Sequence, residues 1–174
     1  MIYINIGSNL DSSNGDRLYN LRKSVELLKI KNFKIIKISK IYETPSYPNN
    51  KNPKFLNICL ALESKEKPDH LIKKFNTIEK KLQRSRSLKN QPRTCDIDII
   101  DYYGKIINSN KIIVPHPRAH LRNFVLYPLR EISPDWLHPL LNIKIEFLIK
   151  KLNFKLRTGF YLKVVLSYSL INYN

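Results

Sequence analysis

The sequence of 174 residues has few glycines and cysteines and no long apolar run. It contains only 4 Gly and 2 Cys, and the cysteines, Cys59 and Cys95, show no CxxC or Cys/His metal-binding spacing. No apolar stretch reaches the roughly 18 residues of a membrane span. The opening Met-Ile-Tyr-Ile-Asn-Ile lacks the basic region and cleavage site of a signal peptide. These absences predict a protein of the reducing cytoplasm with no membrane partner.

The sequence is also poor in negative charge. It has 14 Asp and Glu against 31 Lys and Arg, which gives a formal net charge of +17. Such an excess suggests an anionic partner, either nucleic acid, a membrane surface or a phosphorylated substrate. The 22 Lys, 18 Asn and 23 Ile offer another explanation, because all three have A/T-rich codons. The charge alone is therefore weak evidence for nucleic acid.

Hydrophobic periodicity predicts alternating strands and helices in a chain long enough for one domain. We expect strands over residues 2–7, 33–42, 55–63 and 94–102, a short strand pair around 106–114, and helices over 16–30, 68–83, about 122–131 and about 142–152. The order β-α-β-β-α-β is that of the split βαβ, ferredoxin-like α+β fold, here with an extra C-terminal hairpin and helices. Both main helices should cover one sheet face. The other face is then free to carry two long loops.

The sharpest chemical signal is a pair of acids on a predicted buried strand, Asp96 and Asp98. Residues two apart on a strand point to the same face, with Cα atoms roughly 7 Å apart. Ionised carboxylates among apolar neighbours are costly unless something compensates their charge. Mg²⁺ does so and keeps positions for water and phosphate. The alternative is a pair of solvated acids, or acids paired with nearby arginines.

Two basic segments lie on either side of this strand in the sequence, residues 83–89 and 114–124. Dense Arg and His side chains are good donors to phosphate, and a basic loop beside a metal site can close over a triphosphate. Each segment alone is also typical of a solvated basic loop. A zinc site built on His116 and His120 lacks a Cys or Glu partner nearby.

An aromatic ring and an amide share a strand face at Phe55 and Asn57. This pair suits a flat heterocycle, which the ring would stack on and the amide would hydrogen-bond. The alternative places Phe55 in the core and leaves Asn57 as a polar group at a strand end.

In this order, the segments resemble the 6-hydroxymethyl-7,8-dihydropterin pyrophosphokinase family, folate-pathway enzymes of ferredoxin-like fold. The resemblance covers about residues 1–135. The segments that carry it are Ile6-Gly7-Ser8-Asn9-Leu10, Tyr42-x-Thr44-Pro45, Phe55-Leu56-Asn57, Glu79 with Arg84 and Arg86, Arg93-Thr94-x-Asp96-x-Asp98, and Pro115-His116-Pro117-Arg118-x-His120-x-Arg122-x-Phe124.

The resemblance implies a monofunctional, Mg²⁺-dependent diphosphotransferase over residues 1–156. The hydroxymethyl oxygen of the pterin attacks the β-phosphorus of ATP, and AMP leaves. Asp96 and Asp98 would hold two Mg²⁺ ions. The implied catalytic residues are Arg84, Arg93, Asp96 and Asp98. The implied ATP-binding residues are Asn76, Arg84, Arg86, His116 and Arg122. The implied pterin-binding residues are Thr44, Pro45, Tyr47, Phe55, Asn57 and Phe124, with the two phenylalanines stacked on either side of the ring.

The sequence departs from the family pattern in two places. Asn76 stands where members often carry Gln, and Asn90-Gln91 stand where many carry Trp-Gly. The only tryptophan, Trp136, is expected to pack rather than bind. A weakened member of the family is therefore one alternative.

A second alternative is a non-enzymatic RNA-binding domain of ferredoxin-like fold, although no strand carries the basic, glycine and aromatic run of such domains. We expect a monomer whose partners are ATP and the pterin, with no nucleic acid. Residues 157–174 are expected to be an extension of unknown role.

Overall fold

The structure is a computed structural model that describes residues 1–46, 49, 51–85 and 91–152. Two predicted site residues, Tyr47 and Arg86, and the expected extension 157–174 lie outside the described residues. The elements are β1 (Ile2–Ser8), α1 (Arg17–Ile30), β2 (Lys34–Ile38), β3 (Tyr42–Thr44), β4 (Phe55–Glu63), α2 (Pro68–Lys81), β5 (Asp96–Tyr102), β6 (Ile107–Asn108), β7 (Ile113–Val114), the 3-10 helix η1 (Ala119–Leu121), α3 (Asn123–Ile132) and α4 (Ile145–Lys151).

Local chemistry explains where the two main helices begin. Asp16 caps α1, since its Oδ1 accepts a hydrogen bond from the Tyr19 amide at 2.7 Å. Pro68 begins α2, where its missing amide hydrogen costs nothing. Both helices therefore start within a residue of the predicted position.

The main sheet has the strand order β2-β4-β1-β5, with β3 also paired to β4. All of these pairings are antiparallel. This is the strand order of a split βαβ arrangement, because the first and fourth core strands are neighbours. The predicted ferredoxin-like α+β fold is thus confirmed, and the C-terminal hairpin is β6 paired with β7.

The strand predicted over residues 33–42 is in fact two strands, β2 and β3, with a break at residues 39–41. At the break, the Ser39 hydroxyl accepts a hydrogen bond from the Cys59 amide at 2.9 Å, and the Ser39 amide donates to the Cys59 carbonyl at 2.9 Å. A side chain thus replaces one backbone partner of the ladder, which ends β2. Alternating hydrophobic residues cannot reveal such an interruption.

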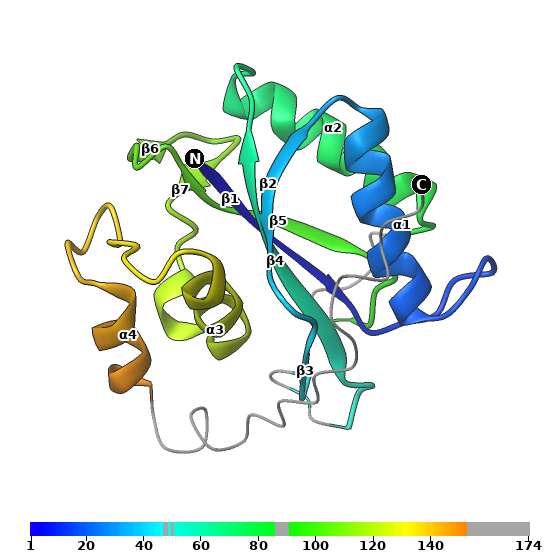
Figure 1. The fold of residues 1–174 in the computed structure, drawn as a ribbon. Helices are drawn as coiled ribbons and strands as arrows, with labels where there is room; N and C mark the ends of the chain where they lie inside the picture. Colours follow the sequence, from blue (N-terminus) through cyan, green and yellow to red (C-terminus); the bar gives the residue numbers. More distant parts are fainter. Residues whose placement is uncertain (47–48, 50, 86–90, 153–174) are drawn as a thin grey trace.

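Helices cover both faces of the sheet, which corrects the expectation of a free second face (Figure 1). Ile2, Ile4 and Ile6 of β1 pack in the core below α1 and α2. On the opposite face, Cys59, Ala61 and Ile100 form a second core with α3 and α4. The expectation failed because α3 is itself strongly apolar along one side, including Val125, Leu126 and Leu129. No helix among the described residues is long and apolar enough to cross a membrane.

Candidate active site

The predicted site residues gather where β1 lies between β4 and β5. Gly7 of β1 is paired with Asn57 on one side and with Asp96 on the other. Neighbouring strands lie about 4.8 Å apart, so Asn57 and Asp96 are separated by only about 10 Å at their backbones. The sheet register therefore places the predicted heterocycle side chains beside the predicted metal-binding acids.

Gly7 leaves room for the side chains of β4. A Cβ atom at this position would lie 3.1 Å from Asn57 Oδ1 and 3.4 Å from Phe55 Cδ1. Asn57 also donates a hydrogen bond from Nδ2 to Thr44 Oγ1 at 3.0 Å, which fixes the orientation of its amide. Thr44 is buried and pairs with Phe55 across the β3–β4 ladder. Phe55, Asn57 and Thr44 thus form one cluster, as predicted, while Pro45 is exposed beside it.

Phe124 lies in the first turn of α3, half-buried. The Arg122 guanidinium carbon is 5.3 Å from the centre of the Phe124 ring, within the range of a cation–π contact. Asn5 of β1, oriented with its amide nitrogen towards the carbonyl oxygens of Phe124 and Ile58, donates to both at 3.2 Å. The buried Asn5 therefore ties the start of α3 to the sheet, a role that its polar character on a buried strand could have signalled.

Asp96 is paired with two predicted site arginines. Its Oδ1 lies 2.7 Å from Arg84 Nη1, and its Oδ2 lies 2.7 Å from Arg93 Nη1. Arg84 is also paired with the buried carboxylate of Glu79. Although burial opposes the charge, the carboxylates of Asp96 and Glu79 raise the pKa of Arg84. Glu79 Oε1 also accepts a hydrogen bond from the amide of Ile97, which lies between Asp96 and Asp98 on β5, at 2.9 Å. One carboxylate therefore contacts both Arg84 and the strand that carries the two acids.

Asp98 faces a different set of partners. Its Oδ2 lies 3.4 Å from Arg122 Nη1 and 3.7 Å from His116 Nε2. Burial and the neighbouring Asp96 carboxylate raise the pKa of Asp98 to about 6. The fold therefore disfavours the ionised form of Asp98 relative to an exposed carboxylate, despite the arginine beside it.

His116 is neutral at pH 7. Burial and the nearby guanidinium groups of Arg122 and Arg118 lower the pKa of His116 to about 4. Its Nδ1 lies 3.1 Å from the Arg118 amide nitrogen and its Nε2 lies 3.3 Å from Arg122 Nη1, so both ring nitrogens face donors and a neutral ring accepts from only one of them. His116 thus places a neutral imidazole among charged groups.

The two acids fit a site for hard divalent cations. Their side chains are 23% and 33% exposed, and they share a sheet face. Among the residues described, no group of three or more His, Cys, Asp or Glu side chains surrounds a possible metal. Two carboxylates with the remaining ligands drawn from water and phosphate oxygens are the usual environment of Mg²⁺.

Asn9 is a residue whose role sequence reasoning missed, although it lies in the Gly7-Ser8-Asn9 motif. It is buried, and its Oδ1 accepts the Arg93 amide at 2.8 Å. Its Nδ2 donates to the Pro53 carbonyl at 3.0 Å and to Ser46 Oγ at 3.1 Å. One amide thus joins the segment before β5 to the loop between β3 and β4.

Asn76, predicted from the resemblance to contact ATP, is half-buried on α2, one turn before Glu79. Asn76 thus lies on the helix that leads to the charged cluster. The ion pairs join the other described site residues of this part into one cluster, namely Arg84, Arg93, Asp96, Asp98, His116 and Arg122.

The site combines two carboxylates, several arginines and a neutral histidine at one end of an α+β sheet. This arrangement is typical of an enzyme that acts on phosphorylated substrates. The family model described as 7,8-dihydro-6-hydroxymethylpterin-pyrophosphokinase (HPPK) matches residues 3–134. The chain belongs to this family, as the sequence resemblance predicted.

Relatives of two lengths support this assignment. The chain is 36% identical over 140 residues to a 2-amino-4-hydroxy-6-hydroxymethyldihydropteridine pyrophosphokinase of Aquifex aeolicus, covering 80% of this chain and 84% of the relative. The enzyme of that name from Bacillus subtilis is 38% identical over 131 residues, covering 75% of this chain and 76% of the relative. A folic acid synthesis protein of Pneumocystis carinii is 36% identical over 87% of this chain, which spans only 20% of that longer protein.

Solved structures show the same fold. The crystal structure of a Plasmodium falciparum HPPK-DHPS triple mutant matches with a TM-score of 0.68 and 14% sequence identity, covering 94% of this chain and 45% of that one.

Proposed function

We propose that the protein transfers a diphosphate group from ATP to the hydroxymethyl group of 6-hydroxymethyl-7,8-dihydropterin, a step of folate biosynthesis that releases AMP. The observation that carries the proposal is the cross-strand row of Asn57, Gly7 and Asp96. It sets the predicted pterin cluster directly beside the cluster of acids and arginines. Two relatives that match over most of their length bear the name of this activity.

In this proposal the protein depends on Mg²⁺, and Asp96 and Asp98 hold two such ions. When bound, the metal neutralises phosphate oxygens and the charge that develops on them during transfer. Arg84 and Arg93, which pair with Asp96 in the structure, turn to the phosphates as catalytic residues. Arg122 and the neutral His116 contact the triphosphate from the side of Asp98. Catalysis then consists of positioning and electrostatic stabilisation rather than of a covalent step.

The pterin lies between Phe55 and Phe124 in the proposed complex. The Asn57 amide, already oriented by Thr44, hydrogen-bonds the edge of the ring. Pro45 and Tyr47 complete this side of the site. Asn76 and Arg86 contact the nucleotide. The roles of Tyr47 and Arg86 rest on the family resemblance alone, and the other roles rest on the resemblance together with the positions of the described residues.

We further propose that residues 1–156 form the catalytic unit, that the protein is a monomer, and that it works in the cytoplasm. Its two cysteines, which are buried and not bonded to each other, support a reducing location. An RNA-binding role is not favoured, because the matching family model and the relatives that match over most of their length bear the name of a pyrophosphokinase.

The test is incubation with ATP, Mg²⁺ and the pterin, with analysis of the nucleotide product. AMP is expected, whereas ADP would identify an ordinary kinase and contradict the proposal. Asp96→Ala and Asp98→Ala should abolish turnover while the protein stays folded. Asp69→Ala on α2 is the matched control, because Asp69 is a half-exposed acid away from the cluster and lies 3.5 Å from Lys111 Nζ. A weakened family member would give AMP at a low kcat.

A further inference from the structure

Two candidate nucleotide contacts, His116 and Arg122, lie at the two ends of η1. The Ala119 amide donates to the His116 carbonyl at 2.9 Å, and the Arg122 amide donates to the Ala119 carbonyl at 3.1 Å. The backbone of this turn therefore fixes the relative position of the two residues. Whatever holds η1 in place also sets where His116 and Arg122 present their side chains.

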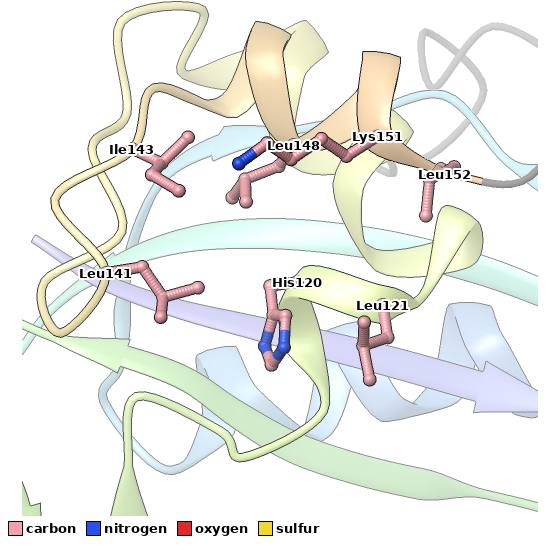
Figure 2. A pocket seen from close by; sticks show the side chains of 7 residues that line it. All are labelled: His120, Leu121, Leu141, Ile143, Leu148, Lys151 and Leu152. Atoms are coloured by element: carbon pink, nitrogen blue, oxygen red, sulfur yellow. The ribbon is translucent and has the colours of Figure 1, made fainter.

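The outer side of η1 is not closely packed against α4. A pocket of about 510 Å³ separates them, and Figure 2 shows Leu141, His120 and Leu121 along one side and the α4 side chains and Ile143 along the other. Leu121 is 57% exposed. Leu121 therefore does not anchor the turn. The buried Ala119, which packs in the second core, holds its backbone, the His116 amide donates to the Ile100 carbonyl of β5 at 3.0 Å, and His120 adds a side-chain contact.

The His120 ring makes such a contact with the segment that follows α3. It meets the His138 ring edge to face, with centroids 5.6 Å apart and planes at 85°. This is a favourable geometry for ring pairs. His138 is only 2% exposed, and its Nδ1 accepts the Leu141 amide at 3.2 Å. Burial and the neighbouring His120 lower the pKa of His138, so it is neutral at pH 7.

The contact continues from His138 to the strand of the two acids. The Trp136 ring lies against the His138 ring at 5.4 Å, with planes at 61°. Trp136 Nε1 donates to Asp101 Oδ2 at 2.7 Å, and Asp101 belongs to β5, the strand that begins at Asp96. Three rings thus connect η1 to the far end of the strand that carries the predicted metal ligands.

We propose that His120 is a positioning residue for the nucleotide, because its ring, through His138, Trp136 and Asp101, fixes the turn bearing His116 and Arg122 relative to Asp96 and Asp98. The inference rests on the proposed function. The positioning depends on the ring of His120 packing against His138, and not on a hydrogen bond from it. His120 Nδ1 and His138 Nε2 are buried and have no hydrogen-bond partner within the described part of the chain.

The experiment compares the full-length wild type with His120→Ala, His120→Phe and Leu121→Ala. Affinity for MgATP is measured by calorimetry, and KM is measured separately for ATP and the pterin. Displacement of positioning groups by about 1 Å can cost up to a hundredfold. Loss of one hydrogen bond to a charged phosphate weakens binding about ten- to a hundredfold. We therefore expect His120→Ala to weaken ATP binding about tenfold and to leave the KM for the pterin unchanged. His120→Phe, which keeps a ring, should retain most of the affinity. Leu121→Ala, on the same turn without a ring contact, should match the wild type.

Trp136 supplies a second readout, since it is the only tryptophan of the chain. Its emission should change in His120→Ala without any ligand and remain close to wild type in His120→Phe. Unchanged ATP affinity in His120→Ala would overturn the inference, as would a His120→Phe variant as impaired as His120→Ala. A wild type that binds MgATP but turns over no pterin would overturn the proposed function alone, because ATP affinity still reports on His120.

Discussion

Replacing Asp98 by asparagine should stabilise the metal-free protein at neutral pH. The pKa of Asp98 is raised from 3.8 to about 6 in the folded state. The folded protein thus binds this proton more tightly than the unfolded chain, and stability falls as the pH rises from about 4 to 6. Two pKa units correspond to about 3 kcal/mol. Because the side chain is 33% exposed, solvent screening reduces this to about 1–2 kcal/mol.

The assay is urea denaturation of wild type and Asp98→Asn in the presence of a chelator, at pH 4 and pH 7.5. The variant should be more stable at pH 7.5 and equal to wild type at pH 4, where Asp98 is already protonated. Asp69→Asn, at a half-exposed acid in the first turn of α2, should lower stability by less than about 1 kcal/mol at pH 7.5 and should not raise it. An Asp98→Asn gain that persists at pH 4, or no gain at pH 7.5, would refute the reasoning. MgATP should reverse the order, because it binds and stabilises only the folded wild type.

Three further substitutions test other parts of the site. Gly7→Ala places a Cβ atom 3.1 Å from Asn57 Oδ1, which pushes the amide out of position. The KM for the pterin should rise several-fold and the KM for ATP should stay near wild type. A variant whose KM for the pterin equals that of the wild type would contradict this. Asn9→Ala leaves the Arg93 amide without its side-chain acceptor and removes one of the two donors to the Pro53 carbonyl, which keeps the Ser46 hydroxyl. It should lower the free energy of unfolding by about 1–3 kcal/mol and speed hydrogen exchange at Arg93. Trp136→Phe removes the donor to the buried Asp101 carboxylate and should cost a similar 1–3 kcal/mol in denaturant titration, which Asp101→Asn as a second change should partly restore.

The sequence predicted most elements because alternation and capping are local properties. The strand over residues 55–63 matches β4 at both ends, since its apolar residues alternate between two cores, with Leu56, Ile58, Leu60 and Leu62 in one and Cys59 and Ala61 in the other. The break at Ser39 could not be predicted, because the serine bonds to Cys59, twenty residues away. The packing of α3 on the second sheet face was also missed, because the apolar side of a helix does not show which distant surface it packs against.

The sequence predicted which residues belong to the candidate site, but not the hydrogen bonds that hold them. The acids and arginines were identified from their residue types and order, and the structure brings them together. The parts played by Asn5, Asn9 and Glu79 depend on contacts with backbone groups far along the chain. Such contacts leave no periodic trace in a sequence.

The central position of β1 bears on how the molecule assembles. Its partners, β4 and β5, begin more than forty and more than eighty residues later, so the pairing that unites the two halves of the site closes long loops. Residues 1–85 contain β1 and β4 and can hold Thr44, Phe55 and Asn57 in register, yet they lack Phe124, β5 and both acids. During synthesis, the first strand must therefore keep one edge unpaired until β5 has emerged, and capture of that edge by a foreign strand is the hazard that this topology carries.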